Sequence, residues 1–148
     1  MNLWSRLFGG AKAETKAPKE NERLVAIAAL LVEAARADDH YTADEQRLIE
    51  RLLVADFGVK PDDLALLLTD AEKLQAEAVD LFRFIRQAKA LSPADRIKLV
   101  ESLWRVILSD GAKHSWEDML VRRVCGLLHV EDVESGLARQ RVQKELGL

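Results

Sequence analysis

The 148-residue chain has a single cysteine, Cys125, and only 5% of its residues are aromatic. One cysteine excludes an intramolecular disulfide and the paired-cysteine patterns of zinc fingers and redox dithiols. No apolar run approaches the roughly 20 residues that a membrane-spanning helix needs. Neither sign of charge predominates, because 22 Lys and Arg stand against 25 Asp and Glu, so the basic excess typical of nucleic-acid-binding proteins is missing. With 49% hydrophobic residues, we expect one cytoplasmic domain with its own core and no nucleic-acid partner.

The first 20 residues differ from the rest, and we expect an N-terminal segment over 1–20 followed by a helical domain over 21–148. The run from Gly9 to Glu20 contains two glycines, a proline and charges of both signs, which is typical of a flexible linker. An amphipathic segment precedes it, whose apolar face is formed by Leu3, Trp4, Leu7 and Phe8. Such a segment is suited to peripheral contact with the inner face of a membrane or with a partner protein. Two turns do not hold a helix in water alone, so a frayed or folded-back tail is the alternative.

From Asn21 onward, apolar residues recur at helical spacing, and no segment alternates with the two-residue period of a strand. Helix starts are marked by Pro61, followed by two acids, and by the capping sequence Ser92-Pro93-Ala94-Asp95. One apolar stripe continues from Leu64 to Ile85 without glycine or proline. A single helix of that length would be unusual, so we expect a break near Gln75-Ala76. The predicted fold class is all-α.

The sequence contains an internal repeat with an offset of 72 residues. Residues 37–45 align with residues 109–117, and the apolar positions on both sides keep the same register. The acids that coincide are Asp38 with Asp110 and Glu45 with Glu117. Each copy is predicted to be a helix, a tight acidic turn and a second helix. Two such hairpins packed about an approximate two-fold axis would bring their turns to comparable places.

The motifs in and around these turns resemble the tellurite-resistance TerB family, in particular its small stand-alone bacterial branch. They are residues 37–39 and 109–111, each with a Glu seven after the Asp, and residues 78–84, 103–106 and 122–130. The resemblance extends from about Leu24 to Arg141. It implies a compact bundle of about seven helices in two pseudo-symmetric halves, with a cluster of acids that is proposed in the family to bind a divalent cation. Two positions depart from the family pattern: Asp39 stands where Gly is usual, and Lys113 where an apolar residue is usual.

Four carboxylates gathered by the two turns would need a compensating charge. At a separation of ~5 Å, each pair would repel by roughly 3 kcal/mol at an effective dielectric of ~20, so the cluster would bind a cation, bind a proton or be neutralised by arginine. Oxygen ligands suit Ca²⁺, Mg²⁺ or Mn²⁺, whereas an added histidine would favour Zn²⁺. The expected metal ligands are Asp38, Glu45, Asp110 and Glu117. The possible auxiliary residues are Asp39, His40, Asp44, His114, Arg51 and Arg123.

Acids at helix ends also have a purely structural use. Thr42-Ala43-Asp44-Glu45 is a complete capping box, and Asp38 and Asp110 are able to form Asx-turns. In the second copy, His114 occupies the position of Thr42 and caps poorly, yet Glu117 persists. That the glutamate is kept without a good capping residue favours a metal site over helix capping as the only role of these acids. An Asp-to-Glu spacing of seven excludes an EF-hand.

These observations lead to three candidate functions. The first is a non-catalytic module that holds a divalent cation and docks a protein partner in a bacterial stress or envelope pathway. The alternative is an adaptor with purely structural acids, acting through its N-terminal amphipathic segment at a membrane surface or on a partner protein. A metal-assisted hydrolase is disfavoured, because no nucleophile, phosphate loop or pocket-forming loop is visible. Cys125 and Trp104 lie on apolar stripes and are expected in the core.

Overall fold

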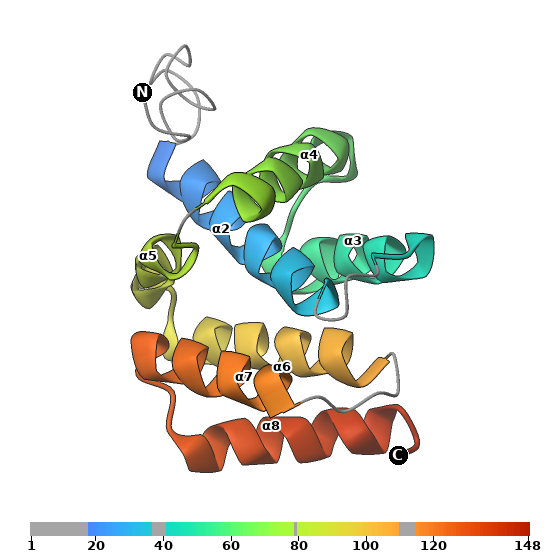
Figure 1. Ribbon diagram of the computed structural model, residues 1–148, viewed down its shortest axis with the longest axis vertical. Coiled ribbons are helices and arrows are strands. Elements are labelled where there is room, and N and C mark those ends of the chain that lie inside the picture. Colours follow the sequence, from blue (N-terminus) through green and yellow to red (C-terminus); the bar gives the residue numbers. More distant parts are fainter. Residues whose placement is uncertain (1–17, 37–40, 79, 110–114) are drawn as a thin grey trace.

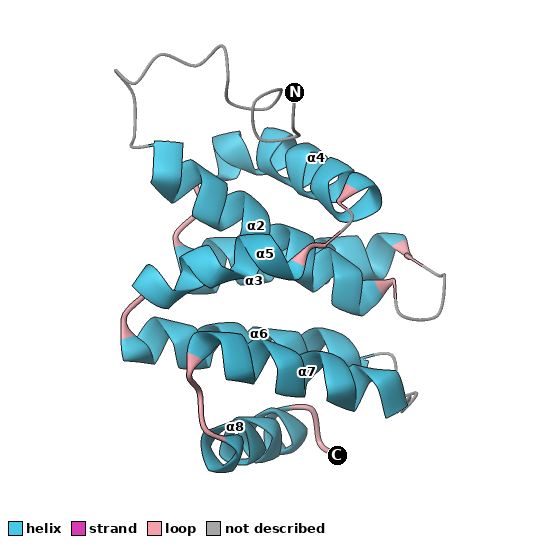
Figure 2. Ribbon diagram, turned by 60° about the vertical axis from the view of Figure 1, so that its left-hand side comes forward, coloured by secondary structure: helices cyan, strands magenta, loops and turns pink. Residues whose placement is uncertain are grey.

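The computed structural model describes residues 18–36, 41–78, 80–109 and 115–148, and these residues form helices and no strand (Figures 1 and 2). The elements are α2 (Pro18–Ala35), α3 (Ala43–Phe57), α4 (Pro61–Glu77), α5 (Phe82–Ile85), the 3-10 helix η1 (Arg86–Ala90), α6 (Pro93–Ser109), α7 (Ser115–Leu128) and α8 (Asp132–Glu145). The predicted all-α class is confirmed. The helix number differs slightly from the expected seven, because six described helices are long and α5 is a single turn that leads into η1.

Local signals place the helix boundaries. Helix α6 begins at Pro93, and the backbone N–H of Asp95 donates to Ser92 Oγ at 3.1 Å, as the capping sequence predicts. Helix α4 begins at Pro61, where the missing N–H of proline leaves no bond unmade. It ends at Glu77, two residues after the expected break. Helix α2 begins at Pro18, inside the stretch predicted as a linker, because proline is also favourable at a first helical position.

Helix α2 is the centre of the core. All eight residues from Val25 to Val32 are at most 1% exposed, so this part of the helix is apolar on every side. A helix of that kind must be covered all round, and α3, α4, α5 and α6 all pack against it. No described helix is long and apolar enough to cross a membrane.

The described helices form two similar halves, α2–α3–α4 and α6–α7–α8. A shift of 72 residues carries the first residue of α3, Ala43, onto the first residue of α7, Ser115. In each half the third helix packs against the first, and α2 packs against α6 between the halves. The ends of α2 and α6 and the beginnings of α3 and α7 lie at the same side of the bundle (Figures 1 and 2). The repeat therefore brings the described ends of both hairpins to one side.

Helices α3 and α7, like α8 with Gly147 at φ 75°, end in a residue with left-handed backbone conformation. Gly58 has φ 68° after α3, and the N–H of Val59 donates to the carbonyl of Leu53 at 3.1 Å. His129 has φ 57° after α7, and the N–H of Val130 donates to the carbonyl of Cys125 at 2.9 Å. Both ends thus satisfy a helix carbonyl by the same bond across six residues. Glycine adopts this conformation without strain, whereas histidine does not.

Candidate functional site

The predicted acidic site falls only partly within the described residues. Of the four expected ligands, Glu45 and Glu117 are described, and each lies in the first turn of its helix. The expected residues outside the described ranges are Asp38, Asp39, His40, Asp110 and His114, together with Leu3, Trp4, Leu7 and Phe8. Within the described ranges, no three His, Cys, Asp or Glu side chains are grouped so that they could hold a metal ion.

Glu45 forms the predicted capping box at the start of α3. The backbone N–H of Thr42 donates to Glu45 Oε1 at 2.9 Å, and the N–H of Glu45 donates to Thr42 Oγ1 at 3.1 Å. The capping interpretation of this acid is therefore confirmed. Asp44, beside it, is exposed and forms an ion pair with Arg47 one turn further along.

Glu117 lies in a different environment from its counterpart in the repeat. Its side chain is 2% exposed, whereas Glu45 is only partly buried. Transfer of a carboxylate out of water is costly unless hydrogen bonds or a positive charge compensate for it. The sequence places Glu117 in an acidic turn but gives no sign of its burial, which depends on packing between helices.

Of the described residues on either side of the first acidic turn, Tyr41 is bonded to α4 and Arg36 stacks on Tyr41. Arg36 and Tyr41 stack, with 5.0 Å between the Arg36 Cζ and the centroid of the Tyr41 ring. Tyr41 Oη donates to Glu72 Oε2 at 2.8 Å. Burial, followed by this bond to a carboxylate, raises the pKa of Tyr41 well above its usual value, so the phenol stays neutral. The two ends of this turn are thus held together at the surface of the bundle.

The two arginines considered as partners of the acids have other surroundings. The guanidinium of Arg123 lies over the ring of Phe82, with 4.0 Å between its Cζ and the ring centroid. Contact of this kind stabilises by about 0.5–1 kcal/mol at an exposed site. Arg51 is exposed on α3 and lines a groove.

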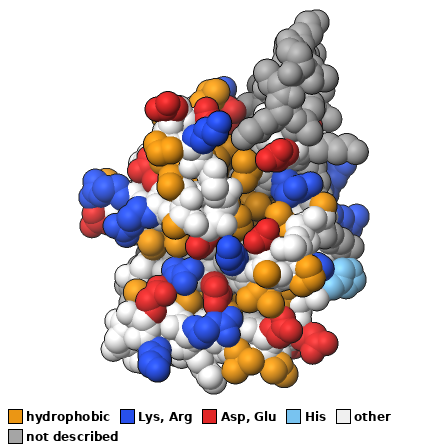
Figure 3. Space-filling view, turned by 180° about the vertical axis from the view of Figure 1, so that it is seen from behind, with side chains coloured by type: hydrophobic (Ala, Val, Ile, Leu, Met, Phe, Trp, Pro, Cys, Tyr) orange, Lys and Arg blue, Asp and Glu red, His pale blue; other side chains and the backbone are white. Residues whose placement is uncertain are grey.

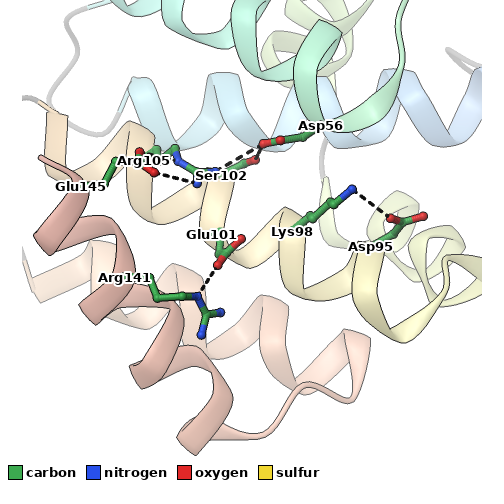
Figure 4. A network of polar contacts seen from close by, with 8 residues as sticks. All are labelled: Asp56, Asp95, Lys98, Glu101, Ser102, Arg105, Arg141 and Glu145. Carbon is green, nitrogen blue, oxygen red and sulfur yellow. Dashed lines mark hydrogen bonds and ion pairs between the residues drawn. The ribbon is translucent and has the colours of Figure 1, made fainter.

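This groove, of about 480 Å³, lies between α3, α6 and the end of α8. It is lined by Leu48, Arg51, Leu52, Ala55, Asp56, Arg105, Ser109, Glu145 and Leu146. Arg105 donates to Glu145 through two bonds of 2.9 and 3.1 Å and to Asp56 through one of 3.4 Å (Figure 4). Ser102 Oγ donates to the same Asp56 oxygen at 3.1 Å. The charge of Arg105 compensates part of the charge of Asp56 and Glu145, and these contacts join α3, α6 and α8.

Two further predictions from the sequence are confirmed. Cys125 is 1% exposed, and burial raises the pKa of its thiol, so the reactive thiolate is disfavoured. Trp104 is 5% exposed, and its indole N–H donates to Ser135 Oγ at 3.3 Å.

Acidic and basic side chains are interspersed over the face in Figure 3, without a large area of one sign.

The described residues define an all-helical bundle of two similar three-helix halves. The family model of the tellurite resistance protein TerB matches residues 24–140, which include most of every described helix. The chain belongs to the TerB family. No curated protein and no solved structure matches it.

Proposed function

We propose that this TerB-family protein is a non-catalytic cytoplasmic module that holds a divalent cation between its two acidic turns and docks a protein partner. The pathway would be a bacterial stress or envelope response. The proposed ligands are Asp38, Glu45, Asp110 and Glu117. The observation that carries the proposal is the burial of Glu117, which is 2% exposed next to the second turn. A carboxylate at a helix start needs no such burial to act as a cap.

The arrangement of the helices supports a shared site. The described ends of both hairpins lie at one side of the bundle (Figure 1). Carboxylate oxygens alone would suit Ca²⁺, Mg²⁺ or Mn²⁺, and a histidine from either turn would favour Zn²⁺.

The test is an amide-resolved NMR titration of chelator-treated protein with each of these four metals separately. We expect saturable shifts confined to residues 36–46 and 108–118, which disappear in the Asp38→Asn/Asp110→Asn variant. Asp62→Asn is the matched control, because Asp62 is an exposed acid in the first turn of α4. Its titration should equal that of the wild type. Absence of any response below about 1 mM metal would refute the cation site, since such weak binding is on the order of non-specific affinity.

The alternative is an adaptor with structural acids that acts through its N-terminal segment. The capping box of Glu45 favours this alternative, because it gives one of the four acids a purely structural role. The apolar face of Leu3, Trp4, Leu7 and Phe8 would then contact a membrane surface or a partner protein. Co-sedimentation with anionic vesicles tests the membrane version. If deletion of residues 1–10 leaves the bound fraction unchanged, the membrane version is wrong.

A further inference from the structure

Helix α8 has two apolar faces, and only one of them packs against the described helices. Its inner face, with Ser135, Ala138 and Val142, is buried against the bundle. On the opposite face, Val133 is 70% exposed and Leu137 is 49% exposed. These two residues are four apart and therefore neighbours on the outer surface. Figure 1 shows α8 as the outermost helix at one end of the molecule, and no described element covers its far side. Hydrophobic side chains are visible at this lower end in Figure 3.

The charges of α8 are ordered along its length. Acids precede the exposed apolar pair or flank it, and bases follow it: Glu131, Asp132 and Glu134, then Arg139, Arg141 and Lys144. The last residue of the helix, Glu145, departs from this order, but its carboxylate is already bonded to Arg105 of α6. Glu134 and Arg141 are both exposed, and their spacing of seven puts them on the same side of the helix. A surface with this order is complementary to itself when one copy is reversed.

We propose that the outer face of α8 binds a second copy of this chain, with the two α8 helices antiparallel about a two-fold axis near Leu137. This axis would place Glu134 of each copy opposite Arg141 of the other, and Leu137 of one copy against Leu137 of the other. A parallel arrangement would instead place acids opposite acids. Gly136, whose missing side chain faces open space, allows close approach of the two backbones.

Arg141 remains available for this contact. Its Nε donates to Glu101 Oε2 at 2.6 Å within the chain, and its side chain is still 53% exposed. Figure 4 shows its two terminal nitrogens directed away from Glu101. Because a guanidinium has five donors, one intrachain bond leaves others for a carboxylate of the second copy.

The dimer should be weak. Contact through one helix face buries less than the roughly 1,000 Å² that a stable interface requires. We therefore expect a monomer in dilute solution and a growing dimer fraction as the protein concentration rises.

Sedimentation equilibrium from about 10 µM to about 1 mM protein tests the proposal. Glu134→Arg and Arg141→Glu should each weaken the dimer about tenfold, because each change turns two attractive pairs into repulsive ones. An equimolar mixture of the two variants should restore dimerisation, since the mixed dimer regains both pairs. A loss of folding in either variant would not produce this rescue.

Two controls separate the interface from other effects. Glu101→Ala removes the intrachain acceptor of Arg141 but leaves the proposed interface intact, so its dimer should match the wild type. Leu137→Glu should abolish the dimer, whereas Leu66→Glu, at a site on α4 that is 69% exposed, should not. The proposal is overturned by a wild type that stays monomeric throughout, by a dimer that survives Leu137→Glu, or by a mixture that dimerises no better than either variant.

Discussion

Replacement of Gly58 by alanine is expected to destabilise the protein, although nothing lies in the way of the new methyl group. A Cβ at Gly58 would have no atom within 4 Å, so the cost comes from the backbone alone. With φ 68° and ψ 22°, this residue is in the left-handed region after α3. In this conformation an L-residue with a side chain is less stable than glycine by roughly 1 kcal/mol. We expect the free energy of unfolding to fall by about that amount.

The same chemical change at Gly126 should act in the opposite direction. Gly126 lies inside α7 and is exposed, and a Cβ at this position would likewise have no atom within 4 Å. Its backbone has no positive φ, so alanine fits there without strain. Alanine should raise the free energy of unfolding by about 0.5–1 kcal/mol, because glycine is the less favourable residue in a helix interior.

Urea and thermal unfolding, followed by circular dichroism, measure both effects. For a chain of this size, 1 kcal/mol corresponds to a shift in Tm of about 2–4 °C. A shift of Tm in the same direction for both substitutions would refute an origin in backbone conformation. His129→Gly provides an internal check, since it relieves a side chain at φ 57° and should stabilise rather than destabilise.

Other predictions concern the polar network and the thiol. Arg105→Ala should lower the free energy of unfolding by about 1–2 kcal/mol, because it leaves Asp56 and Glu145 without their shared partner, and Arg105→Lys should fall between this variant and the wild type. Hydrogen bonds from Arg105 lower the pKa of Glu145, so their stabilisation is present above the usual value near 4.5 and is lost as the pH falls below it. This is checked by comparing the free energies of unfolding of Glu145→Gln and the wild type at pH 7 and at pH 3. At pH 7 they should differ by less than about 1 kcal/mol, since this carboxylate is half-exposed, and at pH 3 the difference should be smaller. Cys125 should react with a thiol reagent only on unfolding; rapid reaction of the native protein would contradict its burial.

The features that sequence reasoning predicted correctly depend on residues close together in the chain. Proline at the first helical position and a capping serine act within one turn, so the starts of α4 and α6 follow from Pro61 and Ser92. The repeat extends this local information, because a 72-residue shift that aligns two acidic turns also aligns the helices around them. Fold class and pseudo-symmetric halves were therefore accessible from the sequence alone.

The side-chain contacts between helices could not be predicted from the sequence, because they join residues far apart in the chain. Tyr41 bonds to Glu72, 31 residues away, and Arg105 reaches Asp56 and Glu145 over 49 and 40 residues. Each of these residues has many possible partners in a charged sequence, and only the packing of helices selects one. The groove beside Arg105 has no sequence signature for the same reason.

The two glutamates of the repeat are equivalent in the sequence but lie in different environments in the structure. The alignment makes Glu45 and Glu117 equivalent, yet Glu45 belongs to a capping box and Glu117 is 2% exposed. Glutamine also completes a capping box, so Glu45→Gln should keep the stability of the apo-protein and lower only the affinity for a cation. Glu117→Gln should lower both, because whatever compensates a buried carboxylate is matched to its charge, and we expect an apo-protein destabilised by roughly 1 kcal/mol or more. Unfolding and metal titration of the two variants side by side check this difference. Equal losses of apo-stability in both would contradict the unequal roles that burial assigns to them.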